Sequence, residues 1–335
     1  MLVQYEKITL FITLINDIII IYDIILKVSA YMRILHLFNW NLNDIIFELD
    51  EIKNQGFDAI QINPLQPLKE DDKDNWWLSY QPCGFQIGNQ YGSKEDLRRL
   101  CDEAFNYDIK VIADVVCGHV AGANDGSLTP HDKVDSKLKG NDFFYKEQKQ
   151  IYDWNDRGQV TRWCMGLPGL DLCNQELQDI IFVFLNDLVH CGVSGFRFDA
   201  AKSIPLPKEG NNFFEKLHNM EKYFDLYNYG EVINASDNLI DEYSNYLSVV
   251  TNYYNGYHKD SVIAFVESHD CYLEFGHTKF KSSREINELY KSLTGVYKST
   301  LYYARPYDEA WKDEAVKAAN FQKEKHRQKV LKRMY

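Results

Sequence analysis

The stretch GFRFD, Gly195–Asp199, decides the fold, because it is a short apolar segment that ends in an acidic residue. A run of this kind is typical of a strand buried on both faces of a parallel sheet. The segment before it has apolar residues at helical spacing and stops at Gly192. Two more acidic residues stand in comparable places, Glu231 in GEV and Asp270 in ESHD. The pattern predicts parallel strands that carry carboxylates near their C-terminal ends.

From Met32 onward, strand-like and helix-like segments alternate, which predicts parallel βα units. Ser93–Asp96 resembles a capping box that opens one of the helices. The eight predicted strands are Arg33–Phe38, Asp58–Asn63, Ile109–Val116, Gly195–Asp199, Leu226–Val232, Tyr246–Thr251, Val262–Ser268 and Thr300–Tyr303. Such a series predicts the α/β class and a (β/α)8 TIM barrel over residues 32–321.

Three segments depart from a simple barrel. The stretch at about 119–172, after the third strand, is too long for an ordinary loop and predicts a small inserted domain. About ten residues separate strands six and seven, which is at the lower limit for a helical crossover, so we expect the sixth helix to be reduced to a loop. Residues 322–335 predict a polar helical tail, whose Lys and Arg side chains form a solvated face rather than a binding patch.

The composition limits the partners. A formal net charge of −12 over 335 residues argues against nucleic acid or an anionic membrane as the main partner. The seven Cys contain no CxxC pair, which indicates neither a disulfide framework nor a zinc site. An aromatic share of 14% suits a carbohydrate binder, because sugars stack on aromatic faces. An A/T-rich genome that overuses Tyr, Ile, Asn and Lys codons would explain that share as well.

Residues 1–31 are apolar and stand apart from the barrel. Asn16, Asp17 and Asp23 interrupt the apolar runs, so no uncharged run is long enough to span a bilayer. Val28–Ala30 could serve as a signal-peptide cleavage site, although the start has no net positive charge. Three interpretations of the extension stay open: a signal or anchor, an artefact of translation upstream of Met32, or a helix of unknown purpose. The compartment follows from that choice: secreted or membrane-anchored with a signal, cytoplasmic without one.

Asp199, Glu231 and Asp270 end predicted strands four, five and seven, and strand ends of this kind converge on one pocket in a barrel. Hydrolysis of a glycosidic bond with retention needs a carboxylate nucleophile and a second carboxyl that protonates the leaving oxygen. Clustered carboxylates repel, so one of them should keep its proton near neutral pH. Arg197 lies two residues before Asp199, faces the same side of the strand and would keep that carboxylate ionised.

At this point the sequence resembles the α-amylase family of glycoside hydrolases. Four segments resemble its short motifs, in the right order: DVVCGH (Asp114–His119), GFRFDAAKS (Gly195–Ser203), GEV (Gly230–Val232) and FVESHD (Phe265–Asp270). LPGLD, Leu167–Asp171, resembles a fifth motif in the insert, and Trp76–Pro82 resembles the stretch after strand two. The likeness covers about 33–321.

The resemblance implies a role for each matching residue. Asp199 would be the nucleophile, Glu231 the general acid and then the base, and Asp270 would hold sugar hydroxyls and stabilise the transition state. The implied substrate-binding residues are Arg197, His119, His269, Tyr80, Trp76, Trp77, Gln81 and Lys202. Among them, Tyr80 would form an aromatic platform under the reacting ring, and Lys202 with Ser203 would line the leaving-group side.

The sequence also departs from the family. Many members bind a structural calcium ion between barrel and insert, through an Asn and an Asp side chain and the backbone carbonyl of a His. This chain has Gly118, Gly169 and Ser203 at those three positions. Calcium needs six to eight oxygen ligands, so we expect its site to be weak or absent and no other cofactor to be required. Most members also continue into a C-terminal β domain, and we expect none here.

These observations favour a retaining hydrolase of α-1,4-glucosidic bonds in starch- or glycogen-like glucans. The expected partner is an α-glucan polysaccharide or oligosaccharide, with no nucleic acid and a monomeric protein. Two alternatives stay open: another activity of the family, such as transglycosylation or maltooligosaccharide processing, and a truncated, inactive glucan-binding remnant.

Overall fold

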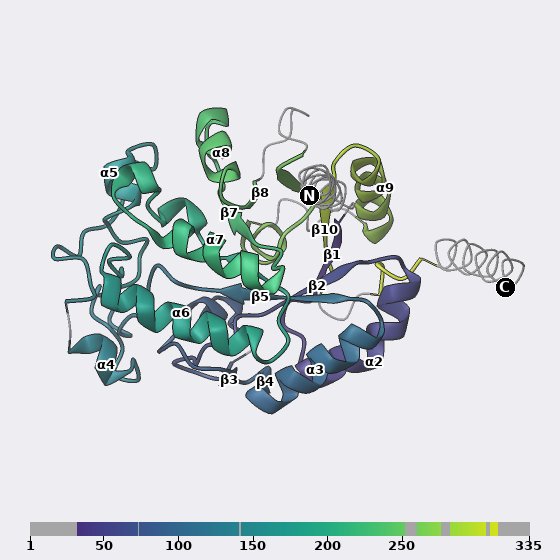
Figure 1. The fold of residues 1–335 in the computed structure, drawn as a ribbon, viewed down its shortest axis with the longest axis horizontal. Helices are drawn as coiled ribbons and strands as arrows, with labels where there is room; N and C mark the ends of the chain where they lie inside the picture. Colours follow the sequence, from purple (N-terminus) through teal and green to yellow (C-terminus); the bar gives the residue numbers. More distant parts are fainter. Residues whose placement is uncertain are drawn as a thin grey trace, which may run out of the picture.

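The computed structural model describes residues 32–313, apart from 73, 141, 252–259, 276–281 and 306–308. Parallel strands close into a barrel in the order β1-β10-β9-β8-β7-β6-β5-β2, which confirms the predicted (β/α)8 fold (Figure 1). The strands are β1 (Met32–His36), β2 (Ala59–Ile62), β5 (Lys110–Val115), β6 (Gly195–Phe198), β7 (Tyr229–Glu231), β8 (Ser248–Val250), β9 (Val262–Phe265) and β10 (Ser299–Tyr303). Three predictions fall outside the described residues: the N-terminal extension at 1–31, the tail at 322–335 and most of the sixth helix.

The predicted C-terminal ends of the strands near Asp199 and Asp270 are wrong. β6 stops at Phe198, so Asp199 begins the turn after the strand. β9 stops at Phe265 rather than at Ser268, and Asp270 lies in the segment that follows. The reason is local: Ser268 accepts hydrogen bonds from the amides of Cys271 (3.3 Å, to Oγ) and Tyr272 (3.1 Å, to O), which turns the chain away from the ladder. That turn continues into the short helix η4 (Cys271–Phe275).

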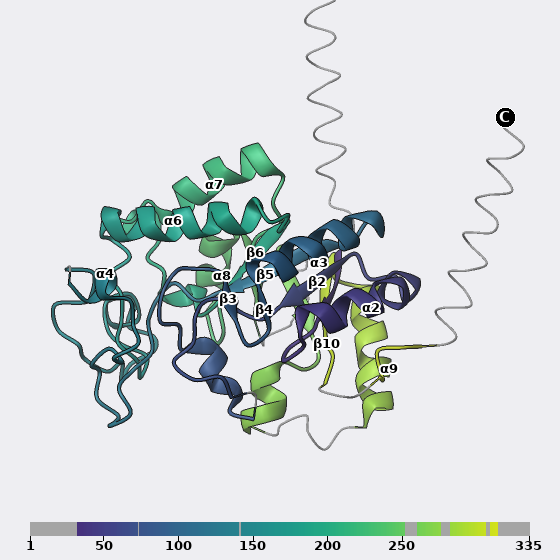
Figure 2. The same ribbon diagram turned by 90° about the horizontal axis from the view of Figure 1, so that it is seen from below.

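Helices pack around the outside of the barrel, as Figures 1 and 2 show. Their bounds are α2 (Leu42–Asn54), α3 (Lys94–Asn106), α6 (Gln175–Val189), α7 (Phe213–Phe224), α8 (Asp237–Ser244) and α9 (Ser283–Thr294). The predicted capping box of α3 is confirmed, because the Asp96 amide donates to Ser93 Oγ (3.1 Å) and the Ser93 amide donates to Asp96 Oδ2 (2.9 Å). None of the described helices is long and apolar enough to cross a bilayer.

Between β5 and α6 the chain runs through the long segment that the sequence predicts as an insert. It holds two one-turn helices, α4 (Ser136–Lys139) and α5 (Arg157–Val160), among irregular backbone. An isolated bridge between His119 and Gly169 ties its two ends together. In Figure 1 this segment lies beside the barrel at the left. That it forms a separate domain stays a prediction.

The barrel interior changes from apolar to polar along the strands. Ile34, Ala59 and Ile112 lie in a buried apolar cluster inside the barrel. Two residues further along the same strands come His36, Gln61 and Asp114, which are buried as well. Because side chains two apart on a strand face the same side, both sets point inward. The polar layer therefore lies at the C-terminal end of the barrel, where such barrels assemble their chemistry.

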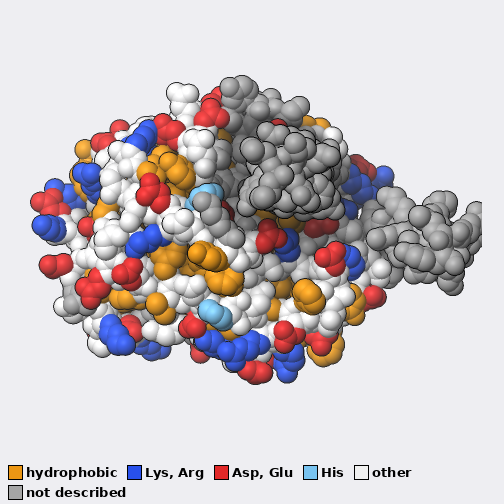
Figure 3. All heavy atoms as spheres, in the orientation of Figure 1, with side chains coloured by type: hydrophobic (Ala, Val, Ile, Leu, Met, Phe, Trp, Pro, Cys, Tyr) orange, Lys and Arg blue, Asp and Glu red, His pale blue; other side chains and the backbone are white. Residues whose placement is uncertain are grey.

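On the surface, acidic and basic side chains are interspersed over the face shown in Figure 3. The excess of acidic residues in the composition is thus not gathered into one patch on that face.

Candidate active site

Arg197 lies at the centre of the polar layer. Strand register places it beside Asp114 on β5 and Tyr229 on β7. Its Nη1 lies 2.8 and 3.0 Å from the two oxygens of Asp114 and 2.9 Å from Asp199 Oδ1, and its Nη2 lies 2.9 Å from Glu231 Oε2. The Arg197 side chain is 5% exposed, so these ion pairs are almost entirely shielded from water. One guanidinium thus joins three carboxyl groups, from β5, from the turn after β6 and from β7.

Glu231, at the end of β7, is held through one of its two oxygens. Oε2 accepts from Arg197 Nη2 and from the backbone amide of Ala200 (3.0 Å). Ala200 has φ +44°, a left-handed conformation that aims its amide across to β7. Gly230 permits this close approach, because a Cβ there would lie 2.5 Å from Cβ of Ala201. Oε1 of Glu231 has no hydrogen-bond donor among the described residues.

Asp199 lies in the turn after β6 and uses Oδ1 to contact Arg197. Its Oδ2 has no hydrogen-bond donor among the residues that the structure describes. Burial raises the pKa of Asp199 well above its usual range, and the Glu231 carboxyl adds to that rise. Arg197 opposes the rise without cancelling it, so the prediction that Arg197 keeps this carboxylate ionised does not hold for the protein without substrate. Burial also raises the pKa of Asp114 against the effect of Arg197. Because one positive charge cannot balance three buried carboxylates, the cluster retains a proton more readily than isolated carboxyls would.

Asp270 joins this group through its neighbour in sequence. His269 Nε2 lies 3.3 Å from Asp270 Oδ1. Burial lowers the pKa of His269 well below 6.5, and the nearby His36 and Arg197 lower it further. The ring is therefore neutral and contacts Asp270 as an uncharged imidazole. Asp270 and Glu231 line the same two cavities, which places them in one site.

Aromatic rings pack beside the carboxylates. Tyr80 stacks on His269 with ring centroids 5.2 Å apart, and its hydroxyl donates to Asp114 Oδ2 (3.0 Å). Trp76 lies edge-on to His269 at 5.5 Å. His119 reaches the group through the Tyr80 carbonyl, 2.9 Å from its Nε2. The structure thus brings these four predicted residues together.

For two of the predicted substrate-binding residues, Trp77 and Gln81, the described residues show no side-chain contact with the carboxylates. Trp77 contacts Trp76 at 6.4 Å and is 48% exposed. Neither Trp77 nor Gln81 lines the cavities beside Glu231. Lys202 does line the larger cavity, and its Nζ donates to the Asn234 carbonyl (3.2 Å).

The larger cavity, of about 630 Å³, opens beside Glu231 and Asp270. Trp154 and Met165 from the insert line it together with Lys202. The sequence analysis missed both insert residues, since nothing periodic marks them. It also left Gln61 and His36 out of the site, although a polar residue within a buried apolar run was an available signal. Gln61 Nε2 lies 3.3 Å from Asp114 Oδ2 and 3.2 Å from His36 Nε2.

The residues at the expected calcium positions do not fit such an ion. Gly118 and Gly169 supply no side-chain oxygen, and a Cβ on Gly169 would lie 2.6 Å from the ring of Tyr145. Ser203 Oγ donates to the Ala200 carbonyl (2.8 Å). Among the described residues, no three His, Cys, Asp or Glu side chains are grouped so as to hold a metal ion. A weak or absent calcium site stays a prediction, and the chemistry below uses no metal.

The curated proteins that this chain is similar to include two bacterial α-amylases. The chain is 37% identical over 236 residues to an α-amylase of Clostridium acetobutylicum, which covers 66% of this chain and 30% of that protein. An α-amylase of Butyrivibrio fibrisolvens is 29% identical over 249 residues, covering 65% of this chain and 25% of that protein. The chain thus spans less than a third of the length of either relative.

Solved structures agree on the fold. The α-amylase I of Eisenia fetida superposes with a TM-score of 0.65 at 22% identity, covering 81% of this chain and 66% of that one. The α-amylase of Geobacillus thermoleovorans, solved with acarbose, gives a TM-score of 0.55 at 22% identity, covering 80% and 59%. A family model described as alpha amylase, catalytic domain, matches residues 39–305. Because that match covers most of the chain and includes each barrel strand from β2 to β10, the chain belongs to the α-amylase family.

Proposed function

We propose that this chain hydrolyses α-1,4-glucosidic bonds of starch- or glycogen-like glucans with retention of configuration. The observation that carries the proposal is the pairing of Asp199 and Glu231 on one guanidinium at the C-terminal end of the barrel. Each of the two carboxyl groups has one oxygen that accepts no hydrogen bond from the described residues. A nucleophile and a proton donor both need such an oxygen to reach the substrate.

In the first step, Asp199 Oδ2 attacks the anomeric carbon while Glu231 Oε1 gives its proton to the leaving glycosidic oxygen. The bond to the leaving sugar breaks as the bond to Asp199 forms. In the second step, Glu231 takes a proton from water, and the hydroxide attacks the same carbon and releases Asp199. Asp270 accepts hydrogen bonds from sugar hydroxyls that strengthen as the ring flattens.

The glucan substrate is supported by the relatives. A mutant of the Eisenia fetida α-amylase I was solved with maltohexaose, at 20% identity and a TM-score of 0.63 to this chain. In this chain the large cavity beside Glu231 offers both an aromatic face, Trp154, and a cationic donor, Lys202, to a neutral sugar chain.

The test is reducing-sugar release from soluble starch by the wild type and by Glu231→Gln. We expect the variant to be about 10²–10⁴-fold slower, because it cannot protonate the leaving oxygen. Glu215→Gln, on the exposed side of α7, is the matched control and should keep full activity. Equal trace release by the wild type and Glu231→Gln would overturn the proposal and leave a glucan-binding protein.

Transglycosylation remains the second candidate, because it uses the same first step and replaces water by a sugar acceptor. The cavity walls of Trp154, Met165 and Lys202 could hold such an acceptor. Chromatography of the products separates the two activities, since transfer makes oligosaccharides longer than the substrate.

A further inference from the structure

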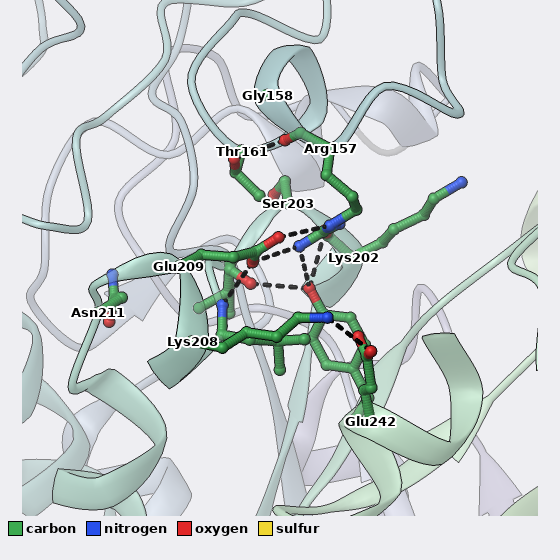
Figure 4. A network of polar contacts seen from close by, with 12 residues as sticks. Arg157, Gly158, Thr161, Lys202, Ser203, Lys208, Glu209, Asn211 and Glu242 are labelled. Atoms are coloured by element: carbon green, nitrogen blue, oxygen red, sulfur yellow. Dashed lines mark hydrogen bonds and ion pairs between the residues drawn. The ribbon is translucent and has the colours of Figure 1, made fainter. Parts of the chain in front are cut away.

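Arg157 of the insert makes a two-pronged ion pair with the barrel. It opens the one-turn helix α5, and its Nε and Nη2 lie 2.9 and 2.8 Å from the two oxygens of Glu209 (Figure 4). Glu209 ends η3 (Pro207–Glu209), in the loop between β6 and α7. A fork-to-fork pair of this kind fixes orientation as well as distance. The two side chains are 25% and 16% exposed, so water screens the pair only in part.

The same guanidinium reaches two more segments. Its Nη1 donates to the Lys202 carbonyl (2.6 Å), and its Nη2 donates to the Tyr243 hydroxyl (3.0 Å) on α8. That hydroxyl lies 2.9 Å from the Lys202 carbonyl and 2.7 Å from the Ile204 carbonyl, and its single hydrogen serves one of them. Arg157 therefore connects the insert with the turn after β6 and with α8.

The turn after β6, which contains Lys202 and Ser203, is also the segment that would contribute a backbone carbonyl to the family's calcium site. The positions that would supply side-chain ligands are Gly118 and Gly169, and the Tyr145 ring occupies the space beside Gly169. The Lys202 carbonyl, one residue before Ser203, instead accepts from a guanidinium, which presents positive charge to a carbonyl as a metal ion would. In this chain the positive charge between insert and barrel therefore belongs to the Arg157 side chain.

We propose that the Arg157–Glu209 pair replaces calcium as the tie between insert and barrel, so that the Lys202 turn is positioned without a divalent cation. The paired state persists at neutral pH: burial alone would raise the pKa of Glu209, but hydrogen bonds from Arg157 and the Leu206 amide lower it below its usual value. The tie itself does not depend on the proposed activity. Its effect on glucan affinity does rest on that activity.

The first experiment needs no variant. Thermal unfolding of the full chain is followed in excess EDTA and in excess calcium chloride. We expect the same Tm in both, because no bound cation contributes to stability. A Tm that EDTA lowers and calcium restores would overturn the proposal.

The second experiment measures the pair by a double-mutant cycle of Arg157→Met and Glu209→Gln. Each single variant should lower Tm by on the order of 5 °C. The double variant should fall little further, since both changes remove the same interaction. Arg157→Lys keeps the charge without the fork and should lie in between. The control is Lys216→Met, which removes a surface ion pair with Asp179 (2.8 Å) and should barely change Tm.

Additive losses in the cycle, or an Arg157 variant that matches the Lys216 control, would contradict the proposal. If the Met variant fails to fold, the comparison of Arg157→Lys with wild type and the EDTA result decide it. With active protein, Arg157→Lys should raise KM for glucan more than it lowers kcat, because the Lys202 turn lies on the leaving-group side. An inactive wild type would refute the proposed function and leave the Tm results interpretable.

Discussion

Oε2 of Glu231 lies 2.9 Å from Nη2 of Arg197, although the two residues stand on different strands. The same guanidinium contacts Asp199, so the two carboxyl groups of the proposed chemistry share one counter-ion. The β6–β7 register places Arg197 beside Tyr229 and Phe198 beside Gly230, so it fixes the guanidinium and the ends of both strands next to the two carboxyl groups.

Replacing Arg197 should destabilise the fold severely. Arg197→Met leaves Asp114 and Asp199 buried without a counter-charge, which should cost about 3–5 kcal/mol of unfolding free energy. Urea denaturation at neutral pH measures the loss. Adding Asp114→Asn to that variant should restore part of it, because one uncompensated charge is removed.

The control for this change is Arg284→Met, on an exposed position of α9 where the arginine pairs with Glu288. That variant should stay within about 0.5 kcal/mol of wild type. If Arg197→Met were equally mild, the guanidinium would not be the element that holds the carboxylates.

His36 should make stability fall with acidity. Burial, aided by Arg197, lowers its pKa to about 3, so it stays neutral in the folded protein at pH 5. In the unfolded chain the same ring takes up a proton near pH 6.5, so the unfolded state binds more protons below that pH. The stability contribution is thus present above about pH 6.5 and declines below it, by up to about 1.4 kcal/mol per pH unit, until about pH 3.

The raised pKa of Asp199 has the opposite effect, because it makes the free energy of unfolding rise as the pH falls. The test therefore compares how steeply the free energy of unfolding changes with pH in the wild type and in a variant. Urea unfolding between pH 7 and 5 should show a steeper fall for the wild type than for His36→Gln. His190→Gln changes an exposed ring on the outside of the barrel and should keep the wild-type slope. Equal slopes for wild type and His36→Gln would refute this assignment.

Trp154 should contribute more to glucan binding than Trp77 does. The two side chains are equally exposed, at 48%, but only Trp154 lines the large cavity beside Glu231. Trp154→Ala should raise KM for a maltooligosaccharide about tenfold with a smaller change in kcat. Trp77→Ala serves as the matched control, and a larger effect there would favour the assignment made from sequence.

The sequence predicted the barrel well because each strand is a short apolar run bounded by helical patterns and glycines. It also predicted the Asp199, Glu231 and Arg197 group, since side chains two apart on a strand face one way and strand ends converge. It extended the seventh strand to Ser268, because Val266 continues the apolar run of β9. The hydrogen bonds to Ser268 that end the strand earlier cannot be recognised from such a pattern.

Other parts of the site depend on how irregular segments pack against the barrel. Trp154 lies in an irregular segment where no periodicity says which side chains meet the barrel. The two neighbours Trp76 and Trp77 look equivalent in sequence, yet η1 (Trp76–Tyr80) turns one toward His269 and leaves the other outside. The Arg157–Glu209 pair joins residues 52 positions apart across two loops. Contacts of that kind follow from packing, which local pattern does not encode.

The proposed mechanism passes through a covalent intermediate on Asp199 and retains the configuration, so the anomeric form of the first product distinguishes it from a single displacement. Proton NMR recorded during the first turnovers on a maltooligosaccharide separates the two anomers before they equilibrate. Retention means that the α-anomer should appear first, and the Asp199→Asn variant should release no product. Initial formation of the β-anomer, or unchanged turnover by Asp199→Asn, would contradict it.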